Sequence, residues 1–73
     1  MTKTVEVRII VGRRIREARN KLNLTQQELA EQADVDYKYL QRIEGKTPQN
    51  LKLETIERIA TALKISPAKL LES

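Results

Sequence analysis

Tyr37, Lys38, Gln41 and Arg42 stand at positions i, i+1, i+4 and i+5 of one short segment. This spacing places the four side chains on one face if the segment is helical. Lys and Arg can donate to O6 and N7 of guanine, and Gln can pair with N6 and N7 of adenine. The segment therefore has the chemistry of a helix that reads base edges in a major groove. The alternative is an ordinary exposed polar helix face.

The helix that precedes this segment has a clear start at Thr25. Thr25 and Glu28 match a capping box, in which each side chain accepts a hydrogen bond from the other residue's backbone amide. Leu24 and Leu29 occupy the hydrophobic-staple positions around it. We expect this helix to end near Ala33.

The helix that carries the four polar residues follows after about three residues. Asp36 is its expected N-cap, and Val35 and Leu40 form a second staple. Gly45 should stop the helix in a left-handed C-terminal position. Two short helices joined by so tight a turn predict a helix-turn-helix at residues 25–44.

Three further helices complete an expected all-α, compact five-helix domain over residues 7–73. Two are predicted at about residues 7–22 and 53–63, and the third is a short helix that begins at Pro67 after a Ser66 cap. Their expected buried residues include Val11, Ile15, Ala18, Leu22, Leu53, Ile56, Ile59, Ala60 and Leu63. Residues 4–9 (TVEVRI) alternate like a strand that has no partner in the chain, so we interpret residues 1–6 as a flexible or partly ordered lead-in or an early helical turn.

The chain has 73 residues and a formal net charge of +4. Its basic residues concentrate in the first 24 positions, whereas residues 25–46 are slightly acidic. A basic balance permits nucleic-acid binding without establishing it. Arg13, Arg14 and Arg16 supply either general attraction to DNA or a solvated surface.

Other chemistry has little support in this composition. The chain contains no histidine and no cysteine, the commonest metal ligands and nucleophile partners. A Gly-rich phosphate loop is also absent from the sequence. We therefore expect no metal, no cofactor and no enzymatic activity. Without an apolar run of about 20 residues or a leader, the sequence favours a cytoplasmic, nucleoid-associated protein rather than a membrane protein.

Three segments together resemble the Cro/C1-type (XRE-family) DNA-binding domain of phage repressors and bacterial regulators. They are Gly12–Arg19 (GRRIREAR), Leu24–Ala30 (LTQQELA), and Val35–Asp36 with Tyr39–Glu44 (YLQRIE). The chain is also similar to the controller proteins of restriction-modification systems, which are stand-alone domains of this length. The resemblance covers roughly residues 7–71 and implies a lambda-repressor-like fold.

The resemblance also implies roles for individual residues. Tyr37, Lys38, Gln41 and Arg42 would read bases or adjacent backbone. Phosphate contacts would come from Thr25, Gln26, Tyr39, Lys46, Asn50 and Arg19, with Thr47 and Gln49 in the same loop. Tyr39 could instead lie against the core. Arg19 and Glu44 would form a structural ion pair between the first and third helices.

The sequence departs from the family pattern at three positions. Gly45 arrives one residue early, which puts the loop contacts in doubt. Tyr37 is bulkier than is usual there, and Lys52 replaces a hydroxyl cap.

The implied partner is double-stranded DNA, bound by a homodimer at a pseudo-palindromic operator as a means of transcriptional regulation. Ile65 and Leu71 are candidate dimer residues, whereas we place Leu63 and Leu70 in the core. The alternative function is a protein-interaction module of the same fold that docks on RNA polymerase or a toxin.

Overall fold

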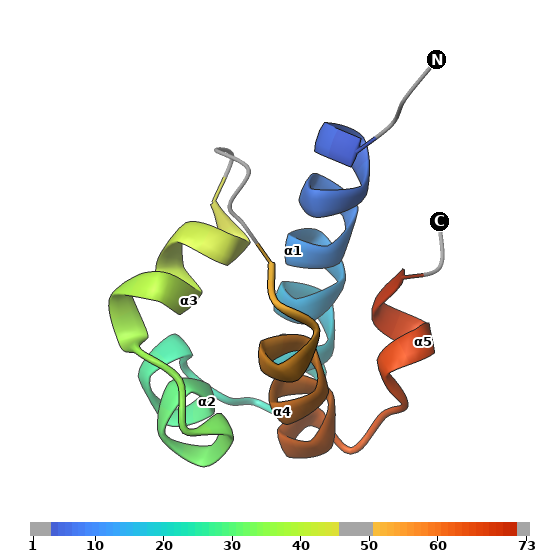
Figure 1. Cartoon of the computed structure of the whole chain (residues 1–73). Coiled ribbons are helices and arrows are strands. Elements are labelled where there is room, and N and C mark those ends of the chain that lie inside the picture. Colours follow the sequence, from blue (N-terminus) through green and yellow to red (C-terminus); the bar gives the residue numbers. More distant parts are fainter. Residues whose placement is uncertain (1–3, 46–50, 72–73) are drawn as a thin grey trace.

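The structure, a computed structural model, describes residues 4–45 and 51–71. Within these ranges the chain forms five helices and no strand, so the expected all-α five-helix fold is confirmed (Figure 1). They are α1 (Thr4–Lys21), α2 (Gln26–Ala33), α3 (Tyr37–Glu44), α4 (Leu53–Leu63) and α5 (Pro67–Leu71).

Helix α1 is the central element of the arrangement. It packs against α3, α4 and α5, while α2 packs against α3 and α4. Helices α3 and α5 therefore lie on opposite sides of α1 (Figure 1). One side of α3 is left free of other helices, which is the arrangement that a groove-reading helix requires.

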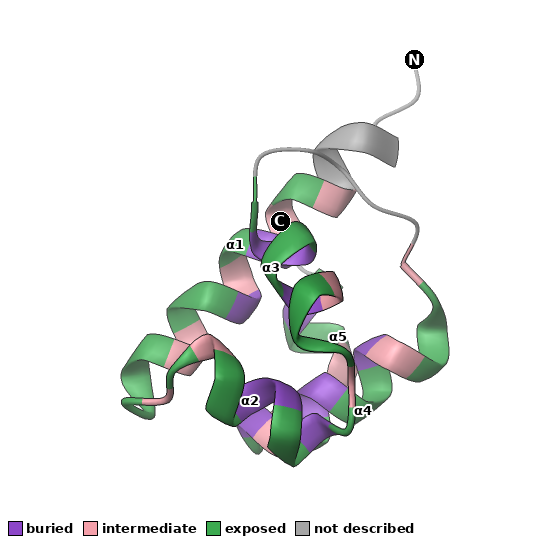
Figure 2. Cartoon of the chain, turned by 90° about the vertical axis from the view of Figure 1, so that its left-hand side faces the viewer, coloured by how far each residue is buried: buried purple, intermediate pink, exposed green. Residues whose placement is uncertain are grey.

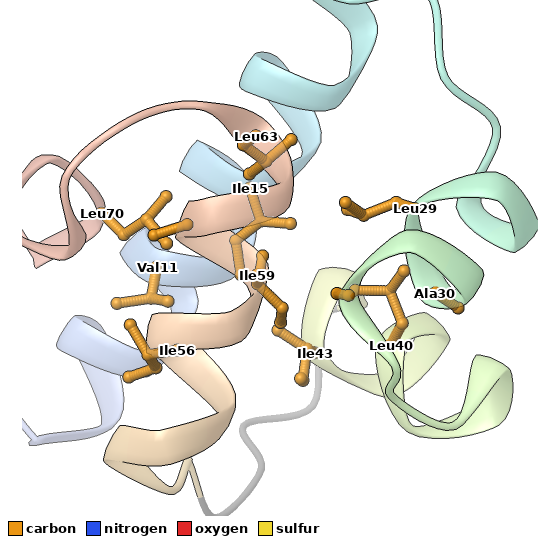
Figure 3. Packing of buried hydrophobic residues seen from close by; sticks show 12 residues of the cluster. Val11, Ile15, Leu29, Ala30, Leu40, Ile43, Ile56, Ile59, Leu63 and Leu70 are labelled. Atoms are coloured by element: carbon orange, nitrogen blue, oxygen red, sulfur yellow. The ribbon is translucent and has the colours of Figure 1, made fainter.

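The core forms where the apolar stripes of all five helices meet. Ile15, Leu29, Leu40, Ile59 and Leu70 are fully buried, one from each helix. Figure 3 shows side chains of α1, α4 and α5 meeting those of α2 and α3, and Figure 2 shows that burial is confined to the inward faces. Leu63 also belongs to the core, as expected.

The caps predicted from sequence are present. Glu28 N donates to Thr25 Oγ1 at 3.0 Å and Thr25 N donates to Glu28 Oε1 at 2.8 Å, which completes the capping box. Asp36 Oδ2 accepts from Tyr39 N at 3.0 Å. These bonds satisfy amides that the start of a helix otherwise leaves without partners.

Several local expectations need correction. Helix α1 begins at Thr4, so residues 4–6 form an early helical turn and the boundary expected at residue 7 falls inside a continuous helix. Leu22 lies beyond the end of α1 and is 40% exposed, and Leu53, in the first turn of α4, is 64% exposed. Both residues stand at helix ends. The apolar sequence pattern continues to these positions, but no neighbouring helix extends far enough to cover them.

Gly45 is not left-handed, contrary to expectation. Its φ is −79°, an ordinary extended value. The left-handed residues in the described chain are Asn23, Asp34 and Lys64, each at the end of a helix. Asn and Asp tolerate this region better than most residues because their side chains are short and polar.

Gly12 is the point of closest approach between α1 and α3. A Cβ at this position would overlap the carbonyl oxygen of Ile43 and lie 3.1 Å from its carbonyl carbon. A backbone atom cannot swing aside as the end of a side chain can. Only glycine therefore lets the two helices pack at this distance, although it costs about 1 kcal/mol of helix propensity relative to Ala.

We expect Gly12→Ala to destabilise the domain because the added methyl collides with the backbone of α3. Overpacking of this kind costs about 1–3 kcal/mol. In a domain of this size that corresponds to a melting temperature lower by roughly 5–20 °C in thermal unfolding.

Gly45→Ala is the matched control. Its Cβ would lie 3.3 Å from the carbonyl oxygen of Gln41, a contact that a small shift relieves. A Gly12→Ala variant as stable as the wild type would show that α1 and α3 do not depend on this contact.

Candidate nucleic-acid interface

The four predicted base-reading residues lie together on the exposed side of α3. Tyr37, Lys38, Gln41 and Arg42 are all exposed, while Leu40, Ile43 and Glu44 on the other side are buried. Burial of one stripe fixes which way the other stripe points. The structure thus presents the polar face as a continuous surface, and base contact itself stays a prediction.

Two of these residues are joined to each other. Gln41 Nε2 donates to the hydroxyl of Tyr37 at 3.0 Å, one helical turn apart. This leaves Gln41 one N–H and its Oε1, the donor and acceptor with which glutamine pairs with adenine. The bulky Tyr37 therefore helps to hold Gln41 in place on the surface.

Behind this face a buried carboxylate connects three helices. Arg19 donates to Glu44 twice, from Nε to Oε2 at 2.9 Å and from Nη2 to Oε1 at 2.8 Å. The expected ion pair between α1 and α3 is therefore present in the structure. The Glu44 side chain is 1% exposed and that of Arg19 11%.

The same network reaches the start of α2. Gln26 Nε2 donates to Glu44 Oε1 at 3.1 Å, and Arg19 Nη1 donates to the carbonyl oxygen of Leu24 at 2.8 Å. Bidentate pairing plus a third donor satisfies the buried carboxylate, which is what makes such burial tolerable. The network fixes the start of α2 against both α1 and α3.

The predicted phosphate contacts differ in how the structure places them. Thr25 is exposed and Gln26 half-buried at the start of α2, where helix amides and dipole favour an anion. Arg19 is mostly buried and committed to the network. The ring of Tyr39 packs against the core. Lys46 and Asn50 lie outside the described residues, as do Thr47 and Gln49.

The candidate dimer residues lie on or next to α5, on the side of α1 away from α3. Ile65 is half-buried against the core, and Leu71 on α5 is 47% exposed. Ile65 lines a groove between α1 and α5 together with Arg14, Lys69 and others. Arg14 Nε is buried there and finds no hydrogen-bond partner among the residues that the structure describes.

Sequence reasoning missed two tertiary contacts in this region. One is the bond from Gln26 to Glu44 described above. The other is Arg58, which donates from Nη1 to the carbonyl oxygen of Asp34 at 3.3 Å, at the C-terminal end of α2, and from Nη2 to Glu54 at 3.0 Å. Arg58 could have been suspected only from its i, i+4 spacing to Glu54.

Residues 4–45 and 51–71 contain no candidate metal centre and no candidate membrane span. No group of three or more His, Cys, Asp or Glu side chains there could hold a metal ion. Nor is any helix in these ranges long and apolar enough to cross a membrane.

The fold and the exposed polar face of α3 define a helix-turn-helix DNA-binding domain. The family model described as Helix-turn-helix matches residues 15–70. The chain belongs to this family, which confirms the resemblance seen in its sequence.

Individual relatives agree with this assignment. The chain is 36% identical over 70 residues to control protein C.BamHI of Bacillus amyloliquefaciens, covering 94% of this chain and 85% of that protein. It is 36% identical to the restriction-modification controller protein C.AhdI of Aeromonas hydrophila, with a TM-score of 0.79 and coverage of 86% and 94%. It is 32% identical to SinR, the master regulator for biofilm formation, in complex with DNA, with a TM-score of 0.81 and coverage of 85% and 98%.

We expect Arg19→Met to destabilise the domain strongly because Glu44 would be left as a buried charge without its main partner. Breaking a buried pair in this way costs about 3–5 kcal/mol. Denaturant unfolding measures the decrease in stability. The matched control is Arg58→Met, which removes an exposed i, i+4 pair with Glu54 and the exposed 3.3 Å hydrogen bond to the carbonyl oxygen of Asp34, and should cost no more than about 1 kcal/mol.

A double variant separates charge burial from the effect on packing. Arg19→Met with Glu44→Met removes both charges, so much of the stability should return. A double variant as unstable as Arg19→Met would contradict the role given to the buried charge.

Proposed function

We propose that this chain is a sequence-specific transcriptional regulator that binds duplex DNA in the cytoplasm, with no catalytic role. Helix α3 would enter the major groove. The observation that carries the proposal is the amphipathic division of α3, whose apolar stripe is buried while Tyr37, Lys38, Gln41 and Arg42 stay exposed. The similarity to SinR, which has been solved in complex with DNA, supports the same assignment.

Each exposed side chain has a definite chemical task in this proposal. Arg42 and Lys38 donate to guanine, and Gln41 pairs with adenine from the position that Tyr37 holds. Thr25 and Gln26 at the start of α2 contact a phosphate and set the register of α3. Gln26 is well suited to this because Glu44 already fixes one of its two N–H groups.

The regulator would act as a homodimer on a pseudo-palindromic operator. Two copies related by a twofold axis would place their α3 helices in successive major grooves about 34 Å apart. The exposed Leu71 and the α1–α5 groove beside Ile65 support this face as the contact, and an acceptor from the second copy would satisfy Arg14 Nε.

Arg42→Ala and Gln41→Ala test the reading helix. We expect each to cost about 1–3 kcal/mol of discrimination at one base position, because each removes a bidentate base contact. The wild-type chain first selects its preferred duplex from a random pool, and binding of both variants to that duplex and to its single-base variants is then measured.

Lys64→Ala at the end of α4 is the control and should leave the base preferences unchanged. Two results would overturn the assignment. One is unchanged preference in both α3 variants. The other is failure of the wild-type chain to select any duplex, which would favour a protein-interaction module.

Leu71→Glu tests the dimer. The new charge would be buried at the contact, so we expect the wild-type dimer to become a monomer in sedimentation experiments and the affinity for a two-half-site operator to fall. Leu22→Glu is the matched control, because Leu22 is a similarly exposed leucine in the turn after α1. A wild-type chain that sediments only as a monomer, with and without operator, would contradict the dimer.

A further inference from the structure

Two arginines of α1 border the C-terminal end of the reading helix. Arg13 and Arg16, with Ile9, line a hollow of about 230 Å³ that Glu44 and Gly45 close from the side of α3. Both arginines are exposed. The ion pairs within the described part of the chain are Arg19–Glu44 and Arg58–Glu54, so neither Arg13 nor Arg16 is paired there.

The carboxylate that lines the hollow with them, Glu44, does not neutralise them, and no ion pair joins them to the exposed Glu17 in the described part of the chain. Glu44 is 1% exposed, and both of its oxygens already accept from Arg19, with Oε1 also accepting from Gln26. The carbonyl end of α3 contributes about half a negative charge through its dipole. The two positive charges of Arg13 and Arg16 exceed this partial negative charge, so the surface at this end of α3 is positive overall. Without the arginines, the carbonyl end of the helix would repel a phosphate.

The position of this surface relative to α3 is rigid. Gly12, next to Arg13, touches the carbonyl group of Ile43 through its backbone. The Arg19–Glu44 pair fixes the same two helices two turns further along α1. The stretch of α1 that carries the two arginines is therefore held against α3 at two points.

The width of the major groove indicates what Arg13 and Arg16 would meet if α3 were bound in it. A helix with its side chains is about 10–12 Å across, close to the groove width of about 12 Å. An α3 seated in the groove thus fills it from rim to rim. Helices α2 and α1 both pack on α3, so with α3 seated in the groove each would lie beside a phosphate rim.

We propose that Arg13 and Arg16 bind a DNA phosphate at the groove rim beside the end of α3, separate from the phosphate contacted by the start of α2. This inference rests on the proposed function. A guanidinium can bind phosphate oxygens through two parallel hydrogen bonds. Ile9, 42% exposed, supplies apolar surface along which the arginine stems can lie.

The test is an Arg13→Gln/Arg16→Gln double variant on the duplex that the wild-type chain selects from a random pool. Removing this one phosphate contact should reduce the slope of log K against log[salt] by about 0.9. The ranking of single-base operator variants should not change, because phosphate contacts carry no direct base information. Since both side chains are exposed, thermal unfolding should match the wild type.

Phosphate ethylation distinguishes direct binding from attraction at a distance. With the wild-type chain, ethylating the phosphate at the α1 rim should block binding, and with the double variant that interference should disappear while interference at the α2 rim remains. Lys64→Gln removes one charge at the end of α4 and should leave the ethylation pattern unchanged.

The outcomes separate the two proposals. If the wild-type chain binds its selected duplex and the double variant keeps both salt slope and ethylation pattern, the inference is overturned and the proposed function stands. A slope that falls with an unchanged ethylation pattern also overturns it. If the wild-type chain binds no duplex, the proposed function fails together with the inference.

Discussion

The buried carboxylate of Glu44 is the interaction on which the interface depends. Glu44 is the last residue of α3, and its carboxylate accepts hydrogen bonds from Arg19 on α1 and from Gln26 at the start of α2. Burying one charge is costly, and three donors offset that cost only while all three helices keep their places. The network therefore ties the positions of α1, α2 and α3 to one another, and with them the position of the surface proposed to bind DNA.

A second constraint acts at the same interface from the backbone. Gly12 lets α1 approach the carbonyl group of Ile43, one residue before Glu44. The ion pair supplies attraction between α1 and α3, and the glycine sets how close that attraction can bring them. Neither is sufficient alone, since a larger residue at 12 would lengthen the distances that the Arg19 guanidinium now spans. The backbone contact at Gly12 and the Arg19–Glu44 ion pair thus favour the same orientation of α3 relative to α1.

Sequence patterns predicted best what is decided locally. The capping box at Thr25, the Asp36 cap and the exposed face of α3 depend on residues within one or two turns, so their spacing was sufficient. The Gln26–Glu44 bond joins residues 18 apart and follows only from the crossing of the helices. Leu53 was misplaced for the same reason, because a stripe does not reveal where its covering neighbour ends.

The division of charge over the fold gives each helix a separate part in recognition. Residues 25–46 are slightly acidic, so the helix-turn-helix would contribute little general attraction to DNA in the proposed function. Most of the positive excess lies on α1, to which the proposal assigns no base contact. Attraction to phosphate is independent of sequence and would strengthen every site equally, whereas base contacts distinguish sites. In the proposed function, keeping the two on different helices that are joined through Gly12 and Glu44 would allow base preference to change on α3 without weakening the affinity that α1 supplies.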